Sequence, residues 1–330
     1  MQQEQVIIIG AGPCGMSAAI ELQNIGVSPL IIEKGNIVDS IYRYPTHQTF
    51  FSSSEKLEIG DVAFVTEKPK PVRIQALSYY RTVAKRKQLR INNFEKVENV
   101  KKHDDIFRIE TVTNRNEQKS YLATQVVIAT GYYDQPNYMH VKGEELPKVS
   151  HYFKEAHPYY KKKVAIIGGK NSAVDAAIEL ERAGAEVTVL YRGSEYSKSV
   201  KPWIIPEFIS LVNHNKITLE FNAHVDEISE QYVEYSVNGV RKKIENDFVF
   251  AMTGYQPDQN FLKDIGITVD ITTGRPNFDH ETMETNVNNI YIAGVIAAGY
   301  DNNEIFIENG RFHGGLIASS IKNKRNQINQ

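Results

Sequence analysis

The sequence has a single cysteine among 330 residues, and this scarcity excludes a fold held together by internal disulfides. It predicts a chain that works in a reducing compartment. No apolar stretch approaches the roughly 20 residues that a membrane-spanning helix needs. Residues 1–13 have no cationic start and no small-residue cleavage pattern, so no secretory signal is expected. Together these absences predict a cytoplasmic protein without a membrane partner.

The chain also lacks an excess of positive or negative charge. The formal net charge is -2 and the pI is near 6.5, which gives no whole-molecule attraction to nucleic acid or acidic lipid. No spacing of cysteine and histidine fits a metal site. With 41% hydrophobic residues, the chain has enough apolar material for two ordinary packed domains.

A glycine-rich turn follows the first buried strand. Val6–Ile9 is a continuous apolar run and Gly10-Ala-Gly-Pro-Cys-Gly15 comes directly after it, so we expect a parallel strand, a tight turn and a helix. A second strand is expected over Ser28–Glu33. In dinucleotide-binding units, such glycines let the backbone approach a diphosphate at the helix amino terminus, and an acid after the second strand binds ribose hydroxyls. Glu33 is predicted to be that acid.

The pattern occurs a second time, at Lys163–Gly168 and the following Gly169-Lys-Asn-Ser172, so the chain is predicted to hold two Rossmann units. Arg192 ends the second strand here, near the place that Glu33 has in the first unit. An arginine can pair with a 2′-phosphate that an acid would repel, so this unit is predicted to prefer NADPH to NADH. The alternative is that Arg192 only ends the strand and faces water. Lys170 replaces the middle glycine, which still permits phosphate binding if its side chain points outward.

The remaining segments predict mostly sheet. Tyr42–Ser54 is aromatic and polar without helical periodicity, and it either covers a flat conjugated ring or forms an ordinary surface loop. Segments that alternate like antiparallel strands are 90–101, 107–113 and 120–125, with a hairpin turn at 114–117. Buried strands that run into glycine turns are Val126–Gly131, the segment from Phe248 to Gly254, and Asn289–Gly294.

The order of these segments predicts an α/β fold in which one domain is inserted into the other. The amphipathic stretch from Glu304 to about Ile321 would complete the first domain. We expect a discontinuous first domain over 1–136 and 263–330, an inserted domain over 161–255, and crossover segments at 137–160 and 256–262.

Taken together, the motifs resemble the two-dinucleotide-binding flavoprotein reductases of the thioredoxin reductase type over nearly the whole chain. They are GAGPCG with Glu33, IATG, GGKNSA with Arg192, MTGYQPD and YIAG, in this order. The resemblance implies FAD in the first domain, NADPH in the inserted one, and hydride transfer between them. The chain departs from that type at two places: residues 149–160 lack the Cys-x-x-Cys pair, and Val295 stands where an aspartate is usual after Gly294.

The single cysteine narrows the resemblance to one family within this type. Cys14 in GAGPCG, together with GGKNSAVDAA and EIFIENGRFHGG, makes the chain similar to the bacillithiol disulfide reductases, or bacilliredoxin reductases, of low-GC Gram-positive bacteria. This implies that Cys14 is the redox residue and that the substrate is bacillithiol disulfide or a bacilliredoxin mixed disulfide. It also implies a homo-oligomer, usually at least a dimer.

Cys14 is therefore the candidate catalytic residue. Helix N–H groups favour its thiolate and a bound FAD diphosphate opposes it; the residues leave that balance open, and Cys14 as a small filler is the alternative. The candidate acids for a leaving thiolate are His47, His151, His157 and His313. The candidate residues of the cofactor sites are Gly10, Gly12, Pro13, Cys14, Gly15, Glu33, Lys34, His47, Val97, Thr130, Gly131, Gly168, Gly169, Lys170, Asn171, Ser172, Arg192 and Gly294.

Three other functions fit parts of the pattern. A flavin-dependent NADPH monooxygenase would consume oxygen, although the Phe-x-Gly start of that group is missing before the second glycine turn. A ferredoxin or flavodoxin NADPH reductase would need no protein thiol. A redox sensor would bind flavin without turnover.

Overall fold

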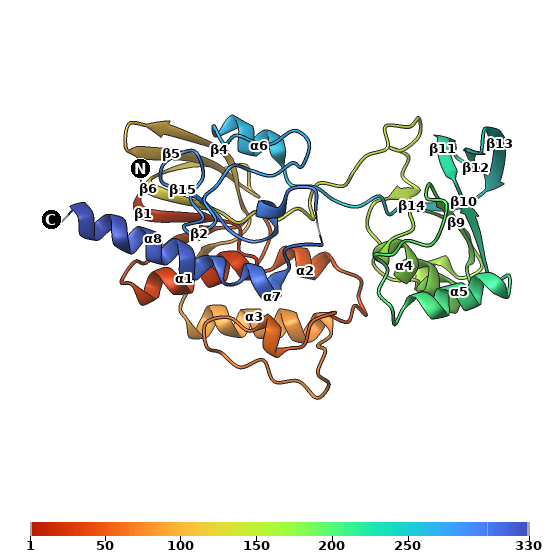
Figure 1. Ribbon diagram of the computed structural model, residues 1–330, viewed down its shortest axis with the longest axis horizontal. Coiled ribbons are helices and arrows are strands. Elements are labelled where there is room, and N and C mark those ends of the chain that lie inside the picture. Colours follow the sequence, from red (N-terminus) through yellow and green to blue (C-terminus); the bar gives the residue numbers. More distant parts are fainter. Residues whose placement is uncertain (1, 302, 329–330) are drawn as a thin grey trace. The chain divides into compact units, whose positions relative to one another are not determined.

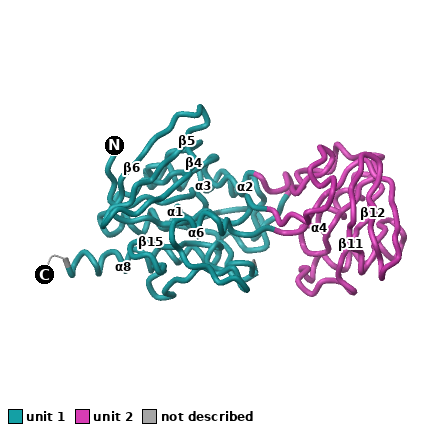
Figure 2. The backbone as a smooth tube through the Cα atoms, turned by 90° about the horizontal axis from the view of Figure 1, so that it is seen from above, with its two compact units in different colours: residues 1–42, 48–135, 255–330 teal, residues 43–47, 136–254 magenta. Residues whose placement is uncertain are grey.

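The computed structural model describes residues 2–301 and 303–328, and the chain divides into two compact units (Figure 2). Unit 1 contains residues 1–42, 48–135 and 255–330, and unit 2 contains residues 43–47 and 136–254. The second unit is thus inserted into a discontinuous first unit. The segment 137–160, expected as a crossover, belongs to unit 2, and unit 1 resumes at residue 255 rather than at 263.

Unit 1 is built on a seven-stranded sheet in the order β3-β2-β1-β6-β5-β4, with β15 paired to β6 (Figure 1). The pairs among β3, β2, β1, β6 and β15 are parallel, whereas β4, β5 and β6 pair antiparallel. The strands are β1 Gln2–Ile9, β2 Leu30–Ile32, β3 Arg90–Asn92, β4 Glu95–His103, β5 Ile106–Thr113, β6 Gln118–Ile128 and β15 Ile290–Ile292. Because parallel strands end at one edge, the turns after β1, β2, β6 and β15 come together there.

Two helices far apart in the chain pack against each other in this unit. Helix α1, Pro13–Asn24, follows the first glycine turn, and α8, His313–Ile328, lies along it (Figure 1). A Cβ on Gly314 would lie only 2.7 Å from the Ala18 Cα atom, so the glycine permits this close approach. The other helical segments of the unit are α2 Asp39–Arg43, whose last residue is assigned to unit 2, η1 Glu55–Leu57, α3 Arg73–Arg86, α6 Gln259–Asp264, η3 Val295–Ala298 and α7 Ile307–Gly310.

Three expected elements differ from the structure. The strand expected over 90–101 is broken at Phe94, whose φ of 57° turns the chain, and β3 pairs parallel to β2. The strands expected at 120–125 and from Val126 are one strand, β6. The amphipathic stretch from Glu304 is divided into α7 and α8. These breaks and joins depend on pairing partners elsewhere in the chain, which local alternation does not reveal.

Unit 2 contains two sheets. The five-stranded sheet has the order β10-β9-β8-β14-β7 with all pairs parallel, and the three-stranded sheet has the order β11-β12-β13 with antiparallel pairs. Its strands are β7 Val149–Ser150, β8 Lys163–Ile167, β9 Glu186–Tyr191, β10 Ile217–Phe221, β11 Ala223–Ile228, β12 Tyr232–Val237, β13 Val240–Glu245 and β14 Phe248–Ala251. Its helical segments are η2 His157–Tyr159, α4 Asn171–Arg182 and α5 Ile205–Asn213.

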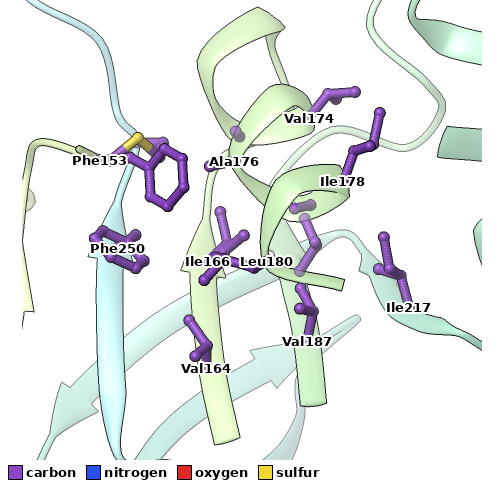
Figure 3. Close-up of a cluster of buried hydrophobic side chains, with 14 of the residues drawn as sticks. Phe153, Val164, Ile166, Val174, Ala176, Ile178, Leu180, Val187, Ile217 and Phe250 are labelled. Carbon is purple, nitrogen blue, oxygen red and sulfur yellow. The ribbon is translucent and has the colours of Figure 1, made fainter. Parts of the chain in front are cut away.

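Helix α4 covers one face of the parallel sheet of unit 2 (Figure 3). Ala176 and Leu180 of the helix and Ile166 of β8 have no exposed surface. Burial of such apolar side chains contributes on the order of 1.5–3 kcal/mol for each large one. The packing fixes the start of α4, and with it the second glycine turn, at the carboxyl end of β8. The prediction of two Rossmann-like α/β units is confirmed.

Candidate functional site

The first glycine turn is shaped by contacts on two of its three glycines. Gly10 has a φ of 108°, and a Cβ there would lie 2.5 Å from the Ala129 carbonyl oxygen. A Cβ on Gly15 would overlap the Gly10 carbonyl oxygen. Around Gly12, by contrast, a Cβ would meet no described atom within 4 Å. The turn is therefore closed toward the sheet and open above Gly12, beside the amino terminus of α1, where an anionic group can approach the backbone.

Glu33 lies at the end of β2 and is buried. Its carboxylate accepts hydrogen bonds from the backbone N–H groups of Ala11 and Gly35, both at 2.7 Å. Burial raises the pKa of Glu33, and these two hydrogen bonds act in the opposite direction. The carboxylate thus joins the turn after β1 to the turn after β2. Each carboxylate oxygen has a further lone pair, which leaves acceptors for hydroxyl groups.

The turn after β6 supplies further polar groups at the same edge of the sheet. The Thr130 hydroxyl is buried and, among the described residues, has no hydrogen-bond partner. Gly131 follows it with a φ of 71°. Three residues later, the Asp134 carboxylate forms an ion pair of 2.5 Å with the Lys34 ammonium. Sequence reasoning missed Asp134, and no local pattern pointed to it, because its partner comes from the turn after β2.

Cys14 is the second residue of α1, after Pro13. A Cβ on Gly294 or on Gly310 would lie 3.0 Å from the Cys14 Sγ atom, so both glycines form walls next to the thiol. Burial raises the pKa of the Cys14 thiol to about 12. This desolvation opposes the thiolate, as a bound FAD diphosphate would, whereas the helix N–H groups favour it. Gly310 was missed, although the glycine-rich stretch 310–315 was a signal for it.

The Gly294 turn is held by a histidine. The Gly294 N–H group donates a hydrogen bond of 3.1 Å to His313 Nδ1, so the neutral imidazole carries its proton on Nε2. Burial lowers the pKa of His313. His313 therefore contacts a glycine that also borders Cys14. Of the four candidate acids, His313 alone belongs to the same unit as Cys14, because His47, His151 and His157 lie in unit 2.

Two further cofactor candidates lie away from this turn in the chain. Val97 is in β4, buried, next to a register shift between Val97 and Asn99. The start of β4 is tied to the end of β2, since the Glu95 N–H group donates to the Glu33 carbonyl oxygen at 2.9 Å. His47 belongs to unit 2, whereas the candidates of the first glycine turn belong to unit 1.

The backbone of the second glycine turn resembles that of the first. Gly168 has a φ of 141°, and a Cβ there would overlap the Met252 carbonyl oxygen. Lys170 is exposed and is the residue before α4, and Ser172 in the first turn of that helix is exposed as well. An exposed Lys170 side chain is compatible with phosphate binding by the backbone of the turn. The side chain of Asn171 is instead engaged with residues 199 and 201.

An aromatic ring lies beside this turn. The Tyr191 ring at the end of β9 occupies the space next to both Gly169 and Gly193, where a Cβ on either residue would overlap it. Arg192, the next residue, is exposed. Unit 2 therefore presents a glycine turn, an aromatic ring and a guanidinium in one place, with no acid equivalent to Glu33.

These observations define a class of protein, an oxidoreductase scaffold with two dinucleotide-binding units of which one is inserted into the other. Residues 7–294 match the family described as pyridine nucleotide-disulphide oxidoreductase. The chain is 62% identical to the bacilliredoxin reductase Bdr of Bacillus subtilis (strain 168) over 99% of its length and 100% of that protein.

Two solved structures agree with this relative. The bacillithiol disulfide reductase Bdr of Bacillus cereus has a TM-score of 0.97 and 61% identity and covers 98% of this chain and 100% of its own. Its counterpart from Staphylococcus aureus has a TM-score of 0.94 and 59% identity over the same shares. The chain belongs to the pyridine nucleotide-disulphide oxidoreductases and, within them, to the family of these Bdr proteins. The resemblance inferred from the motifs is confirmed.

In the described part of the chain, no helix is long and apolar enough to span a membrane. Within the same residues, no group of three or more histidine, cysteine, aspartate or glutamate side chains is placed to hold a metal ion.

Proposed function

We propose that this oxidoreductase uses NADPH and FAD to reduce bacillithiol disulfide or a bacilliredoxin mixed disulfide. The observation that carries the proposal is the position of the only thiol, Cys14, in the first turn of α1 beside the glycine turn of unit 1. The family relationship supports the same substrate class, because the relatives are named for bacilliredoxin and for bacillithiol disulfide.

The residues of unit 1 fit FAD. The open space above Gly12 leaves room for a diphosphate next to the backbone, and the remaining lone pairs of Glu33 suit ribose hydroxyls. The Thr130 hydroxyl is a buried polar group without a partner among the described residues, as expected of a group that contacts a ligand. FAD, when bound, would supply the two-electron chemistry between nicotinamide and disulfide.

Unit 2 fits NADPH. Its glycine turn offers backbone N–H groups at the start of α4, and Arg192 offers a guanidinium for a 2′-phosphate. The Tyr191 ring fills the place in which an acid would repel that phosphate. These features support NADPH over NADH.

The role proposed for Cys14 is thiol–disulfide exchange. In that step the Cys14 sulfur attacks one sulfur of the substrate, the substrate S–S bond breaks, and one thiolate leaves while the other half stays on Cys14. The attack requires the thiolate, whereas burial holds this thiol protonated. Deprotonation of Cys14 therefore has to accompany the attack, and the proton has to leave the thiol as the S–S bond breaks. Two electrons from NADPH then release the second thiol and restore Cys14.

Anaerobic stopped-flow spectroscopy tests the proposal. NADPH should bleach the flavin of the wild type, and bacillithiol disulfide should restore its colour, with one disulfide consumed per NADPH. Anaerobic turnover rejects a monooxygenase. Full turnover by Cys14→Ala would reject the thiol step and favour a ferredoxin or flavodoxin reductase, and a flavin that NADPH cannot bleach would reject the enzyme altogether.

A further inference from the structure

The side chain of Asn171 connects two parts of unit 2 that are distant in sequence. Its Nδ2 group donates a hydrogen bond of 2.9 Å to the Ser199 carbonyl oxygen. Its Oδ1 atom accepts one of 2.9 Å from the Lys201 N–H group. Asn171 is the first residue of α4, so its own backbone is part of the glycine turn. One carboxamide therefore attaches the loop 192–201, which we name the cationic loop, to the phosphate-binding turn.

The other end of the cationic loop is attached to the same turn. The Tyr191 ring lies in the space next to Gly169 and Gly193, and the Asn222 N–H group donates to the Gly193 carbonyl oxygen at 3.0 Å. The loop thus leaves the turn at Tyr191 and returns to it at Asn171. Its position relative to the glycine turn is set at these two ends.

The interior of the loop is ordered by its own contacts. Val200 is buried in the core of unit 2. The hydroxyl groups of Ser197 and Ser199 lie 2.8 Å apart, and the Val200 N–H group donates to the Ser197 carbonyl oxygen at 3.1 Å. The loop is therefore a defined turn with contacts of its own.

The charges of this region are predominantly positive. Arg192, Lys198 and Lys201 belong to the loop and Lys170 to the glycine turn, against one carboxylate, Glu195. The Lys198 ammonium is 4.0 Å from Glu195 and its side chain is 93% exposed, so this pair is screened by solvent. A dianionic phosphate is favoured where several cations act on it together.

We propose that Asn171 is a positioning residue for recognition of the adenosine 2′-phosphate, although it does not itself carry a charge. It holds the cationic loop at the glycine turn, so that the cations of the loop and the backbone of the turn act on the same nucleotide. This inference rests on the proposed use of NADPH. It adds an uncharged residue to those that determine the specificity for NADPH over NADH.

The chemistry of the carboxamide explains why this residue is an asparagine. The two groups that it meets are a carbonyl oxygen and an N–H group two residues later, and a carboxamide offers one donor and one acceptor to match them. An aspartate would place an acceptor against the Ser199 carbonyl oxygen, and an alanine would leave both groups without this partner.

Isothermal titration of the holoenzyme with adenosine 2′,5′-bisphosphate and with 5′-AMP tests the inference without turnover. In the wild type the 2′-phosphate should tighten binding, and Asn171→Ala should reduce that preference by about tenfold while 5′-AMP affinity changes less than about twofold. The matched control is Asn213→Ala, an exposed asparagine at the end of α5 in the same unit, which should leave the preference unchanged.

Two further measurements separate positioning from a general loss of structure. Trp203 is the only tryptophan of the chain and follows Lys201 by two residues, so acrylamide quenching of its fluorescence should rise in Asn171→Ala. The melting temperature should fall by no more than about 5 °C, the cost of the two lost hydrogen bonds. In an Arg192→Ala background, Asn171→Ala should have a smaller effect on the preference, because the two residues act on one phosphate.

The outcomes are distinguishable. Equal weakening of both nucleotides by Asn171→Ala, or no weakening, would overturn the inference while leaving NADPH specificity in place. A wild type that binds both nucleotides alike would overturn the proposed use of NADPH itself, together with the inference.

Discussion

The two glycine turns share a backbone plan and differ in what surrounds them. In unit 1 the turn is followed by Pro13 and Cys14, and the corresponding residues of unit 2 are Asn171 and Ser172. Cys14 is bordered by glycines from the distant carboxyl-terminal part of the chain, whereas Ser172 is exposed. The same local motif therefore yields a half-buried side chain in one unit and an exposed one in the other.

The charged residue that follows the second strand also differs in burial between the two units. Glu33 is buried and accepts two backbone hydrogen bonds, while Arg192 is exposed. A carboxylate that joins two loops stabilises the turn, and its remaining lone pairs are the acceptors that we propose for a ribose. An exposed guanidinium contributes little to folding and is free to select a phosphate. The charged residue after the second strand is therefore part of the structure of unit 1, whereas in unit 2 it is exposed.

The largest expected effect is on the rate at which a thiol is alkylated at position 14 of the first turn, compared with the equivalent position 172 of the second. Because burial raises the pKa of Cys14 to about 12, its thiolate fraction at pH 8 is very small. Alkylation of Cys14 by iodoacetamide should be at least about a thousandfold slower than that of a free thiol with a pKa near 8.5. The rate should rise about tenfold per pH unit from pH 8 to pH 10. Mass spectrometry of the holoenzyme measures it.

The matched variant for this prediction moves the thiol to the other turn. In the double variant Cys14→Ser and Ser172→Cys, alkylation should approach the rate of a free thiol, because residue 172 is exposed. Equal rates for the two thiols would break the contrast between the turns.

The next effect tests how tightly the first turn is closed. Gly15→Ala places a methyl group on the Gly10 carbonyl oxygen, so the free energy of unfolding should fall by about 3 kcal/mol. Flavin content should fall with it. Thermal denaturation and flavin absorbance per protein measure both quantities. Gly12→Ala, whose methyl group meets no described atom, should retain the melting temperature.

A smaller effect, on kcat/KM for NADPH, is expected when the charge of Arg192 is removed. Arg192→Ala removes the guanidinium without touching the core, so kcat/KM for NADPH should fall by about thirtyfold. The value for NADH should change by less than about threefold. Steady-state kinetics with both nucleotides measure the ratio. A ratio that stays the same would support the alternative in which Arg192 only faces water.

The smallest effect is expected where the second turn departs from the motif. Lys170→Gly gives this turn the glycine that the first turn has at Gly12. Because Lys170 is exposed and is the residue before the helix, the KM for NADPH should change by no more than about threefold, and salt dependence should weaken slightly with the lost charge. Kinetics at two ionic strengths measure both. A gain of tenfold or more would mean that the lysine obstructs the turn.

Local patterns predicted much of the fold. The apolar runs before Gly10 and Gly168 identified the first strand of each unit, because a strand buried on both faces is apolar without alternation. The segment 90–101 was predicted less well, since its alternation suits an antiparallel strand throughout. The break at Phe94 and the parallel pairing of β3 depend on β2 as a neighbour.

The candidate site shows the same limit at single residues. Glu33 and Arg192 were predicted from their spacing after a glycine turn, which is a local signal. Asp134 was missed because its ion pair with Lys34 joins two separate turns. Asn171 was expected at the cofactor, and its attachment to the loop at Ser199 and Lys201 was not foreseen.

The sequence by itself determined the two strand–turn–helix units, their order and the single thiol. It also determined the difference in charge between Glu33 and Arg192, which follow the second strand of each unit. These follow from apolar periodicity and from the conformations that glycine permits, both of which act over a few residues. Only the tertiary structure decided that burial raises the pKa of the thiol and that one carboxamide holds the cationic loop. Desolvation and hydrogen bonding depend on which distant segments come to lie beside a residue, and Gly294 and Gly310 reach Cys14 only once the chain is folded.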